Sequence, residues 1–331
     1  MSLLEHARAL SRDVFIYDLR DFDTLLGGLS LNAGVTNANF YAMAEIIIEI
    51  SPPGPFFLQD ENGETVAQDT QPLRPGRYFV VADGTVKQTT EVPLIRLRSF
   101  PTGSRVQAFT NEVRERDGGC AVSKTENRAK QFDFWKGFEA AHIFPLAYEK
   151  QWNDQGWSRQ ITILPTRRTH GTINSVQNGL LLRNDIHDLF DAYAFSINPD
   201  DGHKIVFFQP DNYHLSGTFL DARFLDDPRR PPDSLLRWHF RQAVLTNMRG
   251  AGEPNFEHDF PPGSDIMGEI RRGPKAAERM EFELFDRLAH HMDIYSEEQQ
   301  ADVDTDEDEH EVSTDEDEHD GNVSTSASSI D

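Results

Sequence analysis

Two short apolar runs, each tied to a histidine, constrain the fold of this chain more than any other feature. The first run lies within residues 139–145 and carries His142. The second, residues 178–182, is followed at once by residues 185–191, which carry His187. Both runs have the length of a β-strand, while the apolar residues of the last segment recur at helical spacing. The sequence therefore predicts a strand, a second strand and a helix, with one histidine at the end of the first strand and the other near the start of the helix.

The negative charge of the chain is concentrated in its last residues. The formal net charge of all 331 residues is −24. Residues 297–331 hold 15 Asp and Glu and no Lys or Arg, which leaves 41 acidic and 32 basic residues elsewhere, a net charge of −9. An acidic heptapeptide at 304–310 nearly repeats at 313–319. Such a run cannot bury enough apolar area to offset its ordering entropy, so we expect a disordered acidic tail over 296–331.

Residues 1–103 predict a β-rich N-terminal module. Strands are expected at four β-branched and aromatic runs, residues 14–17, 45–50, 78–81 and 92–97. The pair Asn62-Gly63 favours a tight hairpin turn, because both residues tolerate positive φ. No catalytic constellation stands out here, so this module either binds a partner or supports the next domain.

Helices are predicted on both sides of the central motif. Val106, Phe109 and Val113 share one face of a helix over 104–116, and the Gly pair after Asp117 ends it. Beyond residue 210 the chain predicts a helical C-terminal extension over 211–295. Its two helices are expected from Asp233 or Ser234 to near Gly250, and over 275–292.

Cysteine content and hydropathy exclude several classes of protein. Cys120 is the only cysteine, so an intramolecular disulfide and a multi-cysteine zinc site are both excluded, and we expect Cys120 to be a core residue at the start of a strand. No signal peptide and no run of about 18 apolar residues is found. We expect an intracellular protein, in the nucleus or the cytoplasm, without membrane contact.

Residues 104–210 resemble the HNH endonuclease family, whose members have a ββα-metal fold. The resemblance rests on four pieces in the family's order, residues 113–120, 141–145, 178–182 and 187–191. It implies hydrolysis of phosphodiester bonds with the help of one divalent metal ion, which we expect to be Mg²⁺, Mn²⁺ or Zn²⁺. It also implies a nucleic-acid substrate, with DNA favoured over RNA.

The resemblance gives His142 and Asn178 catalytic roles. The family residue that matches His142 is the general base that takes a proton from the attacking water, and an imidazole with a pKa near 6.5 suits this task at neutral pH. The residue that matches Asn178 holds the loop between the two strands and orients the base, which an amide can do with its donors and acceptors. Asn174 is a competitor for the same task.

His187 matches the family residue that binds the metal, on a helix for which Asp185 is the expected cap. Many family members carry Asp or His directly before the general base as a second ligand, but this chain has Ala141 there. Three carboxylates could supply this second ligand instead: Glu139, Asp188 and Asp191. Asp191 is preferred, because it follows His187 by four residues and shares its helix face.

A stretch without acidic residues predicts a nucleic-acid-binding surface. From residue 155 to residue 184 there is no Asp or Glu, yet four arginines occur, Arg159, Arg167, Arg168 and Arg183. The stretch connects the two histidine segments. Because arginine makes bidentate contacts with phosphate, we expect these residues to contact the nucleic-acid backbone.

The sequence as a whole predicts an α+β protein: a β-rich module (1–103), an HNH nuclease domain (104–210), a helical extension (211–295) and an acidic tail (296–331). We expect a divalent-metal-dependent endonuclease that hydrolyses DNA. The alternative is a catalytically inactive HNH scaffold that binds or regulates, with an acidic tail that docks basic proteins such as histones. The tail has two further readings, as a solvating segment and as an inhibitor of the enzyme's own site.

Overall fold

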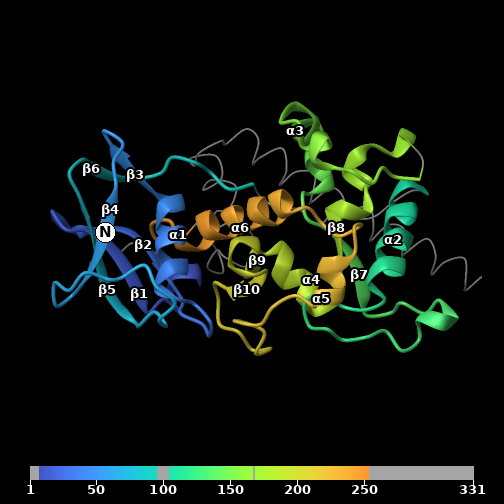
Figure 1. The fold of residues 1–331 in the computed structure, drawn as a ribbon, viewed down its shortest axis with the longest axis horizontal. Helices are drawn as coiled ribbons and strands as arrows, with labels where there is room; N and C mark the ends of the chain where they lie inside the picture. Colours follow the sequence, from blue (N-terminus) through green and yellow to red (C-terminus); the bar gives the residue numbers. More distant parts are fainter. Residues whose placement is uncertain (1–6, 95–103, 167, 253–331) are drawn as a thin grey trace, which may run out of the picture. The chain divides into compact units, whose positions relative to one another are not determined.

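The computed structural model describes residues 7–94, 104–166 and 168–252 of the chain. Within them, a four-stranded sheet forms near the start and a two-stranded hairpin forms at the centre, with helices packed on both (Figure 1). The expected α+β class with a β-rich N-terminal region is therefore confirmed. The helix predicted over 275–292 and the acidic tail over 296–331 lie outside the described residues.

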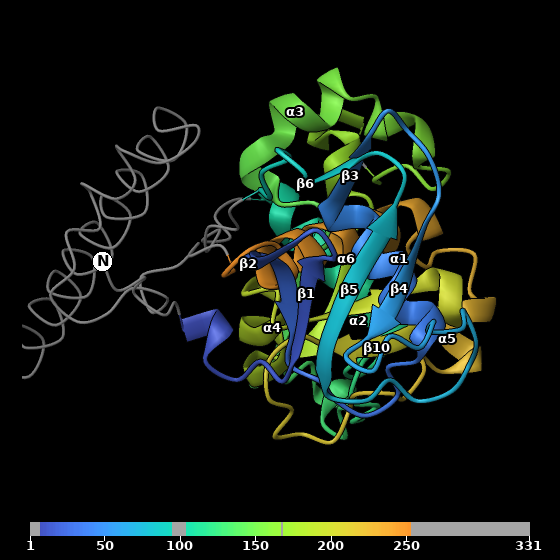
Figure 2. The same ribbon diagram turned by 90° about the vertical axis from the view of Figure 1, so that its left-hand side faces the viewer.

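The N-terminal sheet has the strand order β2-β1-β5-β4, and Figure 2 shows its strands side by side. Its strands are β1 (Val14–Asp18), β2 (Asp21–Leu29), β4 (Phe56–Asp60) and β5 (Gly76–Ala82). β1 pairs antiparallel with β2 and parallel with β5, and β4 pairs antiparallel with β5. A separate antiparallel pair is formed by β3 (Ile48–Ser51) and β6 (Thr85–Gln88). The strands predicted at 14–17 and 78–81 are confirmed.

The turn predicted at Asn62-Gly63 also forms. Gly63 has a φ of +81°. The Asp60 N–H donates to the Glu64 carbonyl at 3.0 Å, and the Gly63 N–H donates to the Asp60 carbonyl at 3.0 Å. Only Gly63 takes the left-handed conformation, because the Asp60 carboxylate accepts from the Asn62 N–H and fixes that residue instead.

The strand predicted over 45–50 is wrong for its first half, because α1 (Asn37–Ile47) extends into it. Thr36 and Asn39 form a reciprocal capping box that starts this helix. Phe40, Met43, Ala44 and Ile47 follow at helical spacing and are buried. The capped start and this apolar face outweigh the strand preference of the isoleucines, and the β conformation begins only at Ile48.

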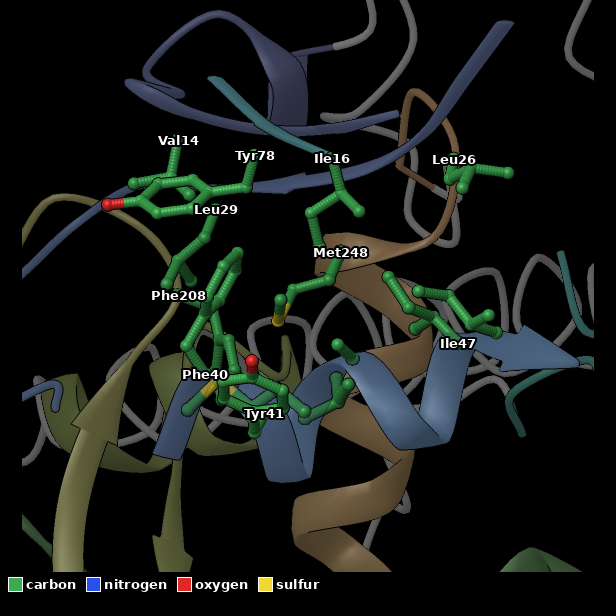
Figure 3. Close-up of a cluster of buried hydrophobic side chains, with 14 of the residues drawn as sticks. Val14, Ile16, Leu26, Leu29, Phe40, Tyr41, Ile47, Tyr78, Phe208 and Met248 are labelled. Atoms are coloured by element: carbon green, nitrogen blue, oxygen red, sulfur yellow. The ribbon is translucent and has the colours of Figure 1, made fainter. Parts of the chain in front are cut away.

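The core of the N-terminal region lies between its sheet and α1. Figure 3 shows Val14, Ile16 and Tyr78 from the sheet facing Phe40 and Ile47 from α1. A late helix, α6 (Asp233–Met248), adds Met248 to the same cluster. This cluster therefore joins segments more than 200 residues apart in the chain.

α6 confirms the helix predicted after residue 233, and it also explains why no strand forms at residues 92–94. The Leu94 N–H donates to Gln242 Oε1 of α6 at 2.7 Å instead of to a neighbouring strand. The remainder of the predicted strand at 92–97 lies outside the described residues. At its other end α6 places Leu235 and Leu236 in the core of the central domain.

The central domain is built on an antiparallel hairpin. Its elements are α2 (Ser104–Asp117), β7 (Phe138–His142), β8 (Gly179–Arg183) and α4 (Asn184–Asp191). They are accompanied by α3 (Glu149–Asp154), the antiparallel pair β9 (Phe195–Asn198) and β10 (Lys204–Phe207), and α5 (Ala222–Asp226). The strand, strand and helix predicted from the two histidine segments are thus present in that order. No helix in the described ranges has the length and hydropathy needed to span a bilayer.

Candidate active site

The β7–β8 hairpin lies between two helices, as Figure 1 shows for α2 and α4. Alternate residues of β7 face opposite ways. Ala140 packs with Phe109 and Val113 of α2, whereas Ala141 packs with Ile186 and Phe190 of α4. The two faces of this hairpin are therefore covered by different helices. Even-numbered residues of β7 face α2, and odd-numbered residues face α4.

Asn178 fixes the loop that follows β7. Its Oδ1 accepts from the Phe144 N–H at 2.8 Å, and its Nδ2 donates to the carbonyls of Phe144 at 3.0 Å and Ile173 at 2.9 Å. The Asn178 carbonyl also accepts from the Ile143 N–H at 2.8 Å. The side chain is completely buried. Asn174 makes none of these contacts and donates to the His170 carbonyl at 2.7 Å, so the loop after β7 is held by Asn178.

We expect Asn178→Ala to lower the free energy of unfolding by about 3 kcal/mol, because three buried backbone groups each lose a partner. Asn178→Asp should cost at least as much, since a carboxylate would face two carbonyl oxygens. Chemical denaturation followed by tryptophan fluorescence measures both. The control is Asn62→Ala on the exposed N-terminal turn, and a loss at Asn178 no larger than the loss at Asn62 would contradict the role of the amide.

His142 ends β7 and stacks on α2. Its ring lies 3.9 Å from the ring centroid of Phe109, with 13° between the planes. Its Nε2 atom is shielded from solvent. Gly179 pairs with His142 across the hairpin, and a Cβ there would approach the Phe109 ring to 2.5 Å. The absence of a side chain at Gly179 thus makes room for the ring that supports His142.

A buried ion pair holds the other side of the same loop. Arg116 Nε lies 2.5 Å from Asp117 Oδ1, and each side chain is 1% exposed. Arg116 donates to the carbonyls of Val176 and Gly179, both at 2.7 Å. The backbone before and after Asn178 is therefore fixed from α2. An Arg-Asp pair directly ahead of two glycines is the sequence signal that could have indicated this contact.

His187 lies on α4 between two carboxylates. Its Nδ1 is 2.7 Å from Glu139 Oε2 of β7, and its Nε2 is 3.2 Å from Asp191 Oδ2 of the same helix. Burial by itself lowers the pKa of His187, but the hydrogen bonds and charges of Asp191 and Glu139 outweigh it and raise the pKa to about 9. The metal-free site therefore holds a protonated imidazole between two carboxylates at neutral pH.

The contacts of the two histidines lie with different helices. Glu139 and His142 are three residues apart on β7, so their side chains point to opposite faces, about 10 Å apart along the strand. His142 meets α2, while His187 contacts Glu139 on the α4 side. The sequence predicts both positions along the chain, but the alternation of the strand separates them.

The other predicted site residues are placed as follows. Asp185 is not the cap of α4: the cap position is Arg183, because β8 runs directly into the helix, and Asp185 sits in the first turn and pairs with Arg183 at 2.5 Å. Asp188 is exposed. Cys120 is buried, as expected, but lies in a turn region instead of a strand.

The predicted arginine surface is only partly described. Arg159 is exposed in a 3-10 turn after α3, and Arg183 is half-buried beside α4. Arg168 is described by its backbone alone, and Arg167 lies outside the described residues. The described part of the chain places Arg159 and Arg183 on separate elements.

The side chains around His187 are of types that bind divalent ions. Two carboxylates and an imidazole suit Mg²⁺ or Mn²⁺, which keep several water ligands, and Zn²⁺ accepts the same donor types. In the described ranges, however, no group of three or more His, Cys, Asp or Glu is placed so that it could hold a metal ion. The 3.2 Å between His187 Nε2 and Asp191 Oδ2 is near the separation of about 3.0 Å expected for neighbouring ligands on one octahedral ion.

Comparison with known families identifies the central domain. Residues 120–198 match the family model described as HNH endonuclease. This chain carries an HNH endonuclease domain. The match contains β7, β8 and α4 and begins after α2, and the resemblance predicted from the four motifs is confirmed. An HNH domain indicates nuclease activity in general and therefore a nucleic-acid substrate.

A second family model matches the region of the N-terminal sheet. Residues 11–87 match a domain of unknown function (DUF8573). Comparisons with curated proteins and with solved structures gave no match. Of the two family matches, the one over residues 120–198 indicates a chemical activity.

The raised pKa of His187 makes metal affinity depend on pH in a defined direction. If His187 binds a metal ion, the ion must displace the proton of the imidazolium, so we expect the Mg²⁺ association constant to rise about tenfold per pH unit up to about pH 9 and then to level off. By the same linkage, the protonated ring stabilises the metal-free fold fully below pH 6.5, and this contribution is lost as the pH rises through about 9. Calorimetric Mg²⁺ titrations at pH 6.5, 7.5, 8.5 and 9.5 measure the slope. A flat profile would remove His187 as a ligand.

Proposed function

We propose that this protein is a divalent-metal-dependent endonuclease that hydrolyses phosphodiester bonds of DNA, with His142 as the general base. The observation that carries the proposal is the position of His187 between Glu139 and Asp191, inside a domain that matches the HNH endonuclease family. A protonated imidazole between two carboxylates is the arrangement that a bound cation would replace.

In this proposal Asp191 shares the metal with His187, and Glu139 orients the ring. The His187–Glu139 contact has the length of a charge-assisted hydrogen bond, whereas the His187–Asp191 contact is longer. α4 follows β8 directly, and Asp191 lies one helical turn further along it than His187. This assignment leaves Glu139 holding Nδ1, as carboxylates commonly hold metal-binding histidines.

The divalent ion would stabilise charge on the phosphate and on the leaving oxygen. His142 would take the proton of the attacking water. Phe109 and the loop fixed by Asn178 hold that ring in place. Asn178 thus supports catalysis through the backbone of the loop.

In this proposal the phosphates of the nucleic acid contact residues 155–184, the segment without Asp or Glu between the two histidines. Arg159 is exposed and available to a phosphate, and Arg167 and Arg168 follow in the same segment. Arg183 already pairs with Asp185, so its contact with phosphate would replace that pair. Each such contact would steepen the dependence of binding on salt concentration.

Plasmid nicking tests the proposal. The purified full chain should convert supercoiled DNA to the nicked form with 5 mM Mg²⁺ or Mn²⁺, and EDTA should stop the reaction. RNA of matched length serves as the comparison substrate. An active preparation that cleaves equally well in EDTA would contradict a metal-dependent mechanism.

A second candidate function is a binding or regulatory protein on an inactive HNH scaffold. It is favoured by Ala141, which is completely buried among apolar residues where many family members carry a ligand, and by the separation of the two histidine faces. This candidate predicts no calorimetric signal at millimolar Mg²⁺ or Mn²⁺ or at micromolar Zn²⁺. Deleting residues 297–331 separates a tail that docks basic proteins, whose binding would be lost, from one that inhibits the nuclease, whose activity would rise.

A further inference from the structure

The loop between α2 and β7 exposes two aromatic rings. We call residues 124–136 the Phe132 loop. Phe132 is 77% exposed and Phe134 is 57% exposed, in a segment that also contains a 3-10 turn, Lys130–Phe132. Figure 1 shows this loop extending outward from the hairpin, between α2 and β7 in chain order. Two large apolar side chains, with Asp133 between them in the chain, are therefore both exposed to solvent.

The exposure of these rings is not a consequence of an unstructured backbone. The side chain of Asn127 donates to the Phe134 carbonyl at 2.9 Å and accepts from the Ala129 N–H at 3.0 Å. The Phe132 N–H donates to the Ala129 carbonyl at 2.9 Å. The neighbouring Trp135 donates from Nε1 to Asp133 Oδ1 at 2.7 Å. The guanidinium carbon of Arg114 lies 5.1 Å from the centroid of the Trp135 ring. The loop is thus held by its own hydrogen bonds, and among its aromatic residues Phe132 and Phe134 are exposed while Trp135 is half-buried.

The charge of the Phe132 loop opposes that of the chain. The loop carries four exposed basic residues, Lys124, Arg128, Lys130 and Lys136, against two acidic ones, Glu126 and Asp133. Its net charge is therefore +2, in a chain whose net charge is −24. Basic residues on both sides of two exposed aromatic rings complement a partner that offers both phosphates and flat π-faces.

The Phe132 loop ends beside the site of His187. The Gly137 carbonyl, directly after the loop, accepts from the N–H of Asn184, the first residue of α4. Glu139, two residues further on, contacts His187. A strand of nucleic acid held by the loop would thus lead toward the end of the hairpin where the cation is proposed to bind.

We propose that the Phe132 loop binds unpaired bases of single-stranded DNA by stacking on Phe132 and Phe134, with the basic side chains on the phosphates. The proposal rests on the proposed nuclease function and names its substrate: single-stranded DNA or single-stranded segments of duplex DNA. Paired bases within a duplex do not present their faces to such rings without unstacking, so the rings give little affinity for an intact duplex.

Fluorescence anisotropy in EDTA tests the proposal without any cleavage. The probes are a labelled 12-nucleotide single strand and a blunt duplex of the same sequence. We expect the double variant Phe132→Ala/Phe134→Ala to bind the single strand at least about tenfold more weakly. Binding of the duplex should change by less than about twofold. The matched control is Phe22→Ala, which removes a ring that is 61% exposed on the N-terminal sheet and should leave both affinities unchanged.

Three results would overturn the proposal: no binding of the single strand by the parent protein, equal weakening for both probes, or equal weakening by Phe22→Ala. A variant of His142 separates this test from that of the proposed function, because it should bind the single strand normally and fail only in cleavage. If the parent protein binds the single strand through the rings but does not cleave, the proposed nuclease function is wrong and the proposal for the Phe132 loop stands. If it cleaves but its binding does not depend on the rings, the proposal for the loop is wrong and the nuclease function stands.

Discussion

The His142→Asn variant is expected to cleave DNA at least about a hundredfold more slowly than the parent protein in Mg²⁺. Asn keeps polar atoms near the end of β7 but cannot take up a proton at neutral pH. The loss should appear in kcat, with little change in KM, because His142 is assigned to the attacking water and not to the binding of DNA. Initial rates of plasmid nicking, measured over a range of DNA concentrations, give both constants.

The matched control is His214→Asn, the same substitution at an exposed histidine whose φ of +56° suits Asn. The unfolding midpoint of His142→Asn should fall only modestly, since one stacked contact with Phe109 is lost. Folded His142→Asn protein that cleaves at the parental rate would remove His142 from the mechanism. The inactive-scaffold candidate makes the opposite prediction, namely no cleavage by either protein.

The His187→Ala variant is expected to lose calorimetric binding of Mg²⁺ and Mn²⁺ at millimolar concentration, and metal-dependent cleavage with it. Removal of the imidazole takes away one ligand and leaves Glu139 and Asp191 with no cation between them. The two carboxylates also lose the partner that keeps them paired in the metal-free protein, so its stability at pH 7 should fall. Thermal unfolding in EDTA measures this second effect independently of metal.

Two further variants decide which carboxylate shares the ion. Asp191→Asn should abolish detectable metal binding, whereas Glu139→Gln should weaken it by about tenfold, the smaller effect typical of a residue that orients a ligand. Asp188→Asn is the control, because Asp188 is exposed on the same helix. If Glu139→Gln were the more damaging change, the metal would belong on Nδ1 of His187 and not on Nε2.

The sequence determined the local order of the HNH domain. Apolar runs of strand length and a helical apolar face placed β7, β8 and α4 correctly, because each signal is local in the chain. The four motifs also identified the HNH family. Asn178 was preferred to Asn174 from its place at the start of the second run; its side chain holds the loop by hydrogen bonds to Phe144, and its catalytic role stays a prediction.

Local signals failed where a distant element decided the conformation. Ile46 and Ile47 favour a strand by their own preferences, but both are helical, and Ile47 lies on the helix face of Phe40 that packs into a core that includes Met248. Leu94 lies in a segment that reads as a strand, yet its N–H is taken by Gln242 of α6. The partners in both cases come from about 150 to 200 residues further along the chain.

The composition of the site also depended on tertiary structure. The sequence by itself determined that His142 ends a strand, that His187 starts a helix, and that three acidic residues are near enough in the chain to help hold a cation. Only the packing of α2 and α4 on opposite faces of the hairpin decided that His142 stacks on Phe109 while His187 lies between Glu139 and Asp191. The physical reason is that strand alternation fixes which residues share a face, whereas the helix that covers each face is chosen by contacts distant in the sequence.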